Sequence, residues 1–263
     1  MDSKLSRKSG NPARALLRAA ERLIACIENL NFTAPVAYVY NPLVYAWAAY
    51  RSYLERFAAT PKRVMLLGMN PGPWGMAQTG VPFGEILAVR EWMGIEEQVR
   101  RPEEEHPRRP VMGFSVTRSE VSGKRLWGLI KQRFGDAEMF FRDHFVGNYC
   151  PLLFLDRDGK NITPDKLRSA DRDSLFRCCD DHLRAVIEAL QPEWLVGIGR
   201  FTEQRLRVLR ESACWKEMKV AGILHPSPAS PLANRGWADL AADRLISLGI
   251  WSSTGAGNCE GAG

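Results

Sequence analysis

The chain has 263 residues, 45% of them hydrophobic, and a formal net charge of +6. This length and apolar content suffice for one buried core, whereas no apolar run reaches the roughly 18 residues needed to cross a bilayer. The sequence therefore excludes a membrane-spanning protein. Without a secretory signal the protein is expected to be soluble and intracellular, and its basic charge suits a polyanionic partner without requiring one.

The cysteine pattern argues against a metal centre and against a disulfide framework. The cysteines have neither a CxxC pair nor a regular spacing. They are Cys26, Cys150, Cys178, Cys179, Cys214 and Cys259. We predict free thiols, most of them in the core, and we expect neither a metal ion nor another cofactor.

The chain is expected to form one domain over residues 12–251, with a disordered tail at each end. The first tail, Met1–Asn11, is polar and basic, and the last, Ser252–Gly263, is rich in glycine and serine, so neither can offset its ordering entropy. After the first tail, apolar residues at helical spacing predict a helix over Ala13–Leu30. A similar pattern predicts a second helix over Pro42–Phe57.

Four short apolar runs predict the strands of a buried sheet. They are Val64–Leu67, Phe145–Leu155, Trp194–Ile198 and Lys219–Leu224. Helical patterns alternate with the runs, at about Lys124–Phe134, Asp171–Leu190, Phe201–Glu211 and Asn234–Leu248, and the last helix is expected to be capped at or near Asn234. This order predicts an α/β fold, a three-layer α/β/α sandwich with a central, mainly parallel four-stranded sheet. The charged segment Arg100–Arg109 is predicted to be an exposed, solvated loop rather than a binding element.

Two loops follow predicted strands, at the edge where parallel sheets bind ligands. The first, Gly68–Gly84, is dense in glycine and proline, so its main chain can hold a flat polar ring through hydrogen bonds. It lacks the spacing of a phosphate-binding or dinucleotide-binding loop. The second, His225–Asn234, carries three prolines that stiffen it. Taken singly, Asn70 is equally compatible with a turn residue, and His225 is better explained as a structural histidine.

Four motifs, in order, carry a resemblance to a known family. They are Gly68–Gly84, Glu120–Gly123 with Trp127, Asn148–Pro151 and His225–Pro228. Through them the chain resembles the single-strand-selective monofunctional uracil-DNA glycosylase family of the uracil-DNA glycosylase superfamily. The resemblance implies that superfamily's fold. It also implies a base-excision-repair enzyme that hydrolyses the N-glycosidic bond of flipped-out uracil in single- and double-stranded DNA and leaves an abasic site.

The resemblance assigns catalytic roles to two residues. Asn70 is expected to position the attacking water, and His225 to donate a hydrogen bond to the uracil carbonyl as negative charge builds there. Neither active-site loop contains a lysine or a carboxylate. The enzyme is therefore predicted to be monofunctional, with no lyase step.

The resemblance also implies a base-binding set made of Met69, Gly72, Met76, Phe83 and Asn148. Asn148 would pair with the O4 and N3–H edge of uracil, and Phe83 would stack on the extruded base, with ordinary core packing as its alternative. Gly72 and Met76 match positions that, in the family, use main-chain groups and a bound water near C5. Polar C5 substituents are admitted there and thymine is disfavoured, so 5-hydroxymethyluracil is an expected substrate.

Further residues are expected to contact DNA. The loop after His225 would act as a wedge during base extrusion, through Pro226, Ser227, Pro228, Ala229, Ser230 and Pro231. At a predicted helix start, the candidates for phosphate contacts are Ser122, Gly123, Lys124 and Arg125. For the two cations, a solvated helix end is an equal alternative. Ala229 and Ser230 replace the arginine and asparagine of animal members, which predicts a preference for single-stranded or mismatched uracil.

Two alternatives stay open at this point. One is a glycosylase broadened to deaminated purines such as xanthine and hypoxanthine; the other is a non-catalytic module that binds damaged or single-stranded DNA. A nucleotide-handling enzyme would need a phosphate loop or an acidic metal cluster, and neither is found in the sequence. The expected partner is DNA containing uracil or modified uracil, with no membrane. We expect a monomer, in the cytoplasm or nucleoid of a bacterium or the nucleus of a eukaryote.

Overall fold

The computed structural model describes residues 10–213 and 215–253, and its centre is a parallel four-stranded sheet. The strand order is β3-β2-β6-β7. The strands are β2 (Val64–Gly68), β3 (His144–Asn148), β6 (Trp194–Ile198) and β7 (Lys219–Ile223). Because all neighbouring pairs are parallel, the carboxyl ends of the four strands share one edge.

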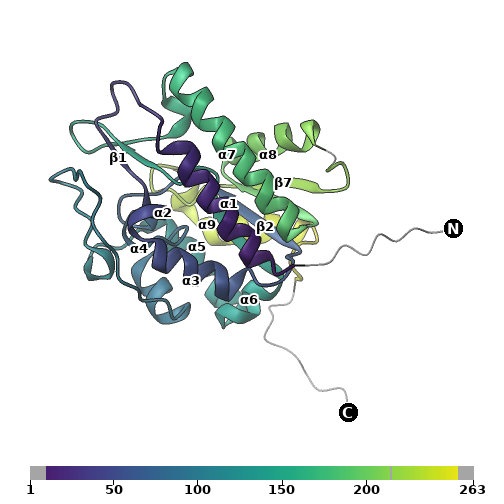
Figure 1. Ribbon diagram of the computed structural model, residues 1–263. Helices are drawn as coiled ribbons and strands as arrows, with labels where there is room; N and C mark the ends of the chain where they lie inside the picture. Colours follow the sequence, from purple (N-terminus) through teal and green to yellow (C-terminus); the bar gives the residue numbers. More distant parts are fainter. Residues whose placement is uncertain (1–9, 214, 254–263) are drawn as a thin grey trace, which may run out of the picture.

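Helices cover both faces of this sheet (Figure 1). In that view α1 (Pro12–Ile27) and α7 (Ser169–Leu190) lie in front of the sheet, and α5 (Val121–Phe134) and α9 (Trp237–Ser247) lie behind it. The other α-helices in the described part of the chain are α2 (Pro42–Tyr45), α3 (Trp47–Phe57), α4 (Met76–Thr79), α6 (Ala137–Asp143) and α8 (Arg200–Ser212). The expected three-layer α/β/α sandwich is thus confirmed.

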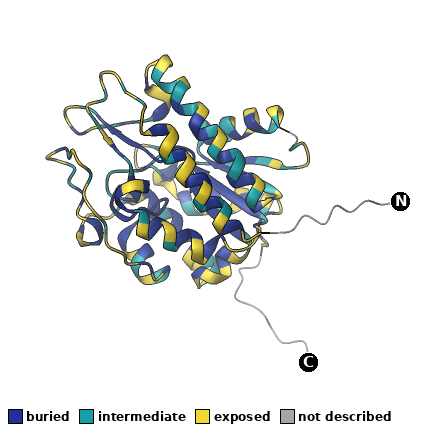
Figure 2. Ribbon diagram, viewed as in Figure 1, coloured by how far each residue is buried: buried dark blue, intermediate teal, exposed yellow. Residues whose placement is uncertain are grey.

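Burial explains why the strands could be read from the sequence. All five residues of β2 are buried, since helices cover both sides of the sheet. Figure 2 shows the buried sheet and the half-exposed helices around it.

The first helix, α1, has a clear local start. The side chain of Asn11 accepts a hydrogen bond from the N–H of Ala13 at 2.9 Å, and Pro12 occupies the first turn.

A second, smaller sheet was not foreseen. It is antiparallel, in the order β1-β4-β5, and consists of β1 (Tyr38–Tyr40), β4 (Leu153–Leu155) and β5 (Asn161–Ile162). The prediction of one strand over Phe145–Leu155 was therefore wrong, because this run divides into β3 of the large sheet and β4 of the small one. Pro151 lies between them, and without an N–H it cannot continue a ladder of hydrogen bonds.

Two predicted helices also differ in the structure. The helix expected over Pro42–Phe57 is interrupted at Ala46, whose φ of −115° and ψ of 27° are not helical. Ala46 is fully buried, and its carbonyl lies so close to Gly80 that a Cβ on that glycine would come within 2.7 Å of it. The helix expected from Asn234 begins at Trp237 instead, after Gly236, whose φ of 114° breaks the helical path.

The cysteine prediction was wrong for one pair. Cys26 in α1 and Cys178 in α7 form a disulfide, with their Cα atoms 5.9 Å apart. The two helices pack directly on each other, and this proximity cannot be seen from a sequence separation of 152 residues. Cys150 and Cys179 are free and buried, as expected. Cys214 and Cys259 lie outside the described residues.

The charged segment Arg100–Arg109 has no helix or strand and is largely exposed, but His106 inside it is buried, contrary to the prediction. Its main-chain N–H donates to the hydroxyl of Tyr40 at 2.7 Å.

Most of the two predicted tails falls outside the described residues. Among helices of the described chain, every one is either too short or too polar to cross a membrane.

Candidate active site

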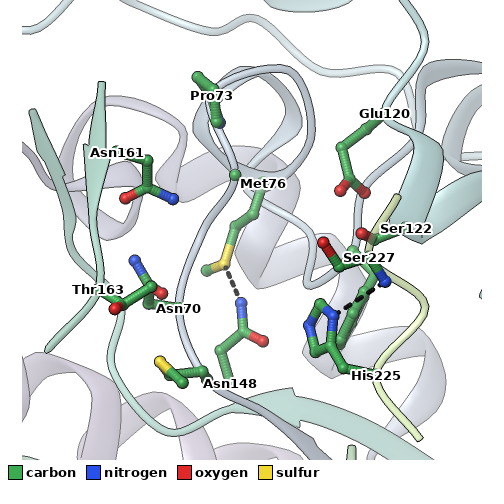
Figure 3. A pocket seen from close by; sticks show the side chains of 13 residues that line it. Asn70, Pro73, Met76, Glu120, Ser122, Asn148, Asn161, Thr163, His225 and Ser227 are labelled. Carbon is green, nitrogen blue, oxygen red and sulfur yellow. Dashed lines mark hydrogen bonds between the residues drawn. The ribbon is translucent and has the colours of Figure 1, made fainter. Parts of the chain in front are cut away.

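A cavity of about 380 Å³ opens at the carboxyl edge of the large sheet, a volume typical of small-molecule sites. Both loops singled out in the sequence contribute to it (Figure 3). Its lining residues are Met69, Asn70, Gly72, Pro73, Met76, Phe83, Glu120, Ser122, Asn148, Asn161, Thr163, His225 and Ser227. The fold thus brings together the two predicted catalytic residues and all five predicted base-binding residues, from segments more than 150 positions apart.

Asn70 follows β2 and is held by its amide nitrogen. Its Nδ2 donates to the carbonyl of Leu152 at 3.2 Å and, at 3.4 Å, to the carbonyl of Pro71. Because carbonyl oxygens only accept hydrogen bonds, the NH2 group must face them. The side-chain oxygen Oδ1 is therefore the atom left to accept a hydrogen bond from a molecule in the cavity.

His225 follows β7, and its tautomer is fixed by the chain. The N–H of Ser227 donates to its Nδ1 at 3.1 Å, so Nδ1 carries no proton in the neutral ring and Nε2 carries it. Burial lowers the pKa of His225 below its usual value of 6.5, which favours the neutral ring at neutral pH. His225 therefore offers the cavity a neutral donor, its Nε2–H.

Asn148 ends β3 directly beside the end of β2. Its register partner is Gly68, and a Cβ on that glycine would lie 2.5 Å from Oδ1 of Asn148 and 2.4 Å from the ring of Phe83. Only glycine fits there. The amide nitrogen of Asn148 donates to the sulfur of Met76 at 3.2 Å, a weak acceptor that a better ligand can replace.

Phe83 has an unusual main-chain conformation. Its φ of 52° is in the left-handed region, which a bulky residue occupies only when its surroundings impose it. Its carbonyl accepts hydrogen bonds from the indole N–H of Trp127 at 2.9 Å and from the N–H of Glu85 at 2.7 Å. Its ring centroid lies 6.2 Å from that of His225. This conformation holds an aromatic ring at the wall of the cavity.

Helix α5 supports the loop that carries Phe83. A Cβ on Gly123 would lie 2.1 Å from the Phe83 carbonyl, so the glycine permits the close approach of helix and loop. Glu120 caps the helix, accepting from the N–H of Gly123 at 2.6 Å, and burial raises its pKa. The Glu120–Trp127 motif of the sequence thus holds the aromatic wall in position.

The loop after His225 is tied to the same helix. The guanidinium of Arg125 donates to the carbonyl of Pro226 at 3.0 Å and to the side-chain oxygen of Asn234 at 2.9 Å. The amide of Asn234 also donates to the carbonyl of Pro228 at 2.9 Å. Asn234 therefore braces the loop instead of capping α9, and Arg125 has a structural role that the sequence did not indicate.

Of the predicted DNA-contacting residues, only Ser122 and Ser227 line the cavity. Pro228, Ala229 and Pro231 are exposed on the loop, and Lys124 is exposed at the start of α5. The N–H of Gly123 is taken by Glu120, so this helix start presents one donor fewer to an anion. Leu232, in the same loop, is 58% exposed and received no role from the sequence.

Four lining residues received no role from the sequence: Pro73, Glu120, Asn161 and Thr163. Asn161 and Thr163 come from β5 and the residue after it. An Asp158-Gly159 pair precedes β5, with apolar residues on both sides, and this is the usual sequence signal of a hairpin. That signal could have located the hairpin, although not its position against the cavity.

Comparison with known proteins adds three findings. Residues 55–242 match the model of the Uracil DNA glycosylase superfamily. Two relatives, one from Bos taurus and one from Rattus norvegicus, are both named single-strand selective monofunctional uracil-DNA glycosylase. This chain is 48% identical to the first and 47% identical to the second, in each case over 238 residues, which are 90% of this chain. The matches cover 87% of the Bos taurus protein and 85% of the Rattus norvegicus protein. The crystal structure of Pedobacter heparinus SMUG2 shares the fold, with a TM-score of 0.61 at 18% identity, over 88% of this chain and 97% of that one.

Proposed function

Because the chain belongs to the single-strand selective monofunctional family of the uracil-DNA glycosylase superfamily, we propose that it excises uracil from DNA, preferentially from single strands and without a lyase step. It hydrolyses the N-glycosidic bond and leaves an abasic site in genomic DNA inside the cell. The observation that carries the proposal is that Asn70 and His225 line the same cavity. Asn70 offers an acceptor for water, and His225 offers a neutral donor for the leaving base.

His225 stabilises the departing base. As the N-glycosidic bond breaks, negative charge builds on the uracil ring, and the Nε2–H of His225 donates to the C2 carbonyl oxygen. A fixed donor aimed at the developing charge lowers the barrier, because it makes its strongest contact in the transition state. A neutral ring suffices for this, and the hydrogen bond from Ser227 keeps the proton on the correct nitrogen.

Asn70 orients the nucleophile. Its Oδ1 accepts a hydrogen bond from a water directed at C1′ of the sugar, while Leu152 holds the amide in place. Asn70 has no basic pKa in the useful range, which suits a dissociative path in which the sugar cation needs an oriented water more than a strong base. Phe83 stacks on the base, and Asn148 pairs with its O4 and N3–H edge after releasing the sulfur of Met76.

The substrate range extends to uracils oxidised at C5, with 5-hydroxymethyluracil as the representative case. Position 72 is a glycine, so no side chain from this loop residue fills the space beside the base. An assay on labelled oligonucleotides, followed by alkali to cleave abasic sites, tests the activity. If uracil oligonucleotides stay intact under single-turnover conditions, the chain is a DNA-binding module and the proposal fails. Cleavage of xanthine or hypoxanthine substrates at comparable rates would establish the broader glycosylase instead.

We expect uracil in single strands to be excised faster than uracil paired in duplex, because extrusion from a stack costs a few kcal/mol. Ala229 gives the wedge loop a small side chain where animal members carry arginine. Ala229→Arg is expected to raise the duplex rate relative to the single-strand rate. Ala25→Arg adds the same charge on the exposed face of α1 and serves as the control. Equal effects of both variants, or a wild-type duplex rate at or above the single-strand rate, would show that the loop does not act as a wedge.

The pH profile should reflect the neutral state of His225. Acid protonates the ring and removes the acceptor for the Ser227 N–H, so activity falls below the pKa of the histidine. Because burial lowers that pKa, the neutral ring persists further into acid and the acid limb should lie below pH 6.5. Single-turnover rates between about pH 5 and 8 measure the limb. A midpoint at or above pH 6.5 would show that the ring is not held neutral.

A further inference from the structure

Two arginines from different segments converge on the indole ring of Trp74. The guanidinium carbon of Arg118 lies 4.9 Å from the ring centre, and that of Arg109 lies 5.6 Å from it. Both distances are in the range of cation–π contacts, which hold a guanidinium against an aromatic face. Arg118 is exposed, and Arg109 and Trp74 are half-buried, so the group is open to solvent. These three side chains are called the Trp74 patch.

The Trp74 patch lies beside the mouth of the cavity. Trp74 directly follows Pro73, a residue of the cavity lining. Arg118 precedes another lining residue, Glu120, by two positions. A Cβ on Gly75 would lie 2.9 Å from Cγ of Glu120, so the two segments pack directly against each other. In Figure 3, Pro73 and Glu120 both lie at the top of the view, which places the patch next to that side of the cavity.

A buried glutamine fixes the Trp74 loop against the segment of Arg109. Gln78 is fully buried, and its Nε2 donates to the carbonyl of Pro73 at 2.9 Å and to that of Pro110 at 3.0 Å. These two carbonyls belong to the neighbours of Trp74 and Arg109 in the chain. The glutamine therefore holds the ring and one of the cations in a fixed relation to the cavity.

The protein does not neutralise the charges of the Trp74 patch. Across residues 10–213 and 215–253, neither Arg109 nor Arg118 forms an ion pair with a carboxylate. The side chain of Arg109 donates to the carbonyl of Arg108 at 2.9 Å, while its Nε is buried without a partner. Glu105, in the same segment, is 3.6 Å from Arg101 instead. Two cations near one ring repel each other, and an anion bound to both offsets that repulsion.

We propose that the Trp74 patch binds a phosphodiester group of the DNA strand next to the extruded uracil. The site deepens the proposed function and rests on it, because the strand reaches the patch when its uracil enters the cavity. The sugar-phosphate chain of that strand stays at the cavity mouth, where Arg109 and Arg118 lie. A guanidinium can keep its face on an indole while the N–H groups at its edge bind phosphate oxygens. Arg109 thus differs from the solvated loop that the sequence predicted for its segment.

This contact contributes to binding and not to bond cleavage. A phosphate beside the reacting nucleotide carries the same charge before and during the reaction. Its interaction with the two guanidinium groups is therefore equally strong in the bound substrate and in the transition state, which lowers KM and leaves kcat alone. The contact needs one strand only, so it is available in single-stranded DNA.

The test measures DNA binding separately from excision, on the full chain. Fluorescence anisotropy gives the affinity of wild type, Arg109→Gln, Arg118→Gln and the double variant for a uracil-free single-stranded oligonucleotide at several salt concentrations. Each single substitution should weaken binding roughly three- to tenfold at low salt. In the double variant, the slope of log affinity against log salt should become shallower by about 0.7, the contribution of one phosphate in a single strand. With a uracil oligonucleotide of the same length, the effect should appear in KM and not in kcat.

Two further variants separate the site from a general effect of charge. Arg18→Gln removes the same charge from the exposed face of α1 and is the matched control, expected to keep the wild-type affinity and salt slope. Arg118→Lys keeps the charge without the planar fork, so it should keep the salt slope and lose part of the affinity. Thermal melting verifies that each variant is folded, and Arg118 is exposed, so its replacement leaves the core intact.

Unchanged affinity and salt slope in folded Arg109→Gln and Arg118→Gln would overturn the phosphate site. Losses no larger than that of Arg18→Gln would overturn it as well, and so would a fall in kcat at unchanged affinity. A wild-type protein that binds DNA through these arginines yet leaves uracil in place would instead overturn the proposed function, so the two failures are distinguishable.

Discussion

Replacing His225 with alanine is expected to lower the single-turnover rate of uracil excision by roughly a hundredfold to a thousandfold, the usual effect of removing one donor to a developing oxyanion. The donor contacts the base most strongly in the transition state, so kcat should fall more than binding weakens. The measurement is single-turnover cleavage of a single-stranded uracil oligonucleotide, with affinity determined separately by fluorescence anisotropy.

A second variant tests whether the hydrogen bond from Ser227 to Nδ1 of His225 contributes to the rate. Ser227→Pro removes the main-chain N–H that holds Nδ1, while His225 itself remains. This variant should lose part of the rate, because the ring is no longer restricted to the tautomer that donates through Nε2. Near-normal activity of His225→Ala would show that another group stabilises the leaving base.

Asn70→Ala should cost about a hundredfold or more in kcat, because an unoriented water seldom attacks along the correct line. The proposed base contacts of Phe83, Asn148 and His225 are left intact, so the affinity for a uracil oligonucleotide should change little. Rapid-quench kinetics and anisotropy measure the two quantities. A large loss of affinity with an unchanged kcat would assign Asn70 to base binding instead.

Asn70→Asp tests how the side chain is held. Aspartate keeps an acceptor for water but cannot donate to the carbonyl of Leu152, and its charge would face that oxygen. The carboxylate is therefore expected to turn away from its asparagine position, and the variant should be slower than wild type although it carries a stronger base. A faster variant would show that basicity, and not orientation, limits attack.

The strands were the most predictable part of the fold. The run Val64–Leu67 gave β2 to within one residue and Trp194–Ile198 matched β6, because strands covered on both faces are apolar throughout. The small sheet was not predictable in the same way. A strand as short as β5 has no period of its own and exists only through its pairing with β4.

Several details of the structure depend on contacts between distant segments. Asparagine is a residue type that often caps helices, yet the side chain of Asn234 accepts a hydrogen bond from Arg125, more than a hundred residues away. The N-cap of α9 is Gly236 instead. Cys26 and Cys178 have no motif in common and are joined because α1 packs on α7. Local preference is weak enough for one good tertiary contact to override it.

The sequence by itself determined which chemical groups the candidate site contains and at which strand ends they lie. Glycine and proline end β2 just before Asn70 and β7 just before His225, and these are local effects of backbone conformation. Only the tertiary structure decided what the groups can do. Leu152 directs the oxygen of Asn70 toward the cavity, Ser227 sets the proton of His225 on Nε2, and a hairpin absent from the motifs supplies Asn161. Hydrogen-bond direction depends on partners that folding brings together, and no local pattern in the chain encodes it.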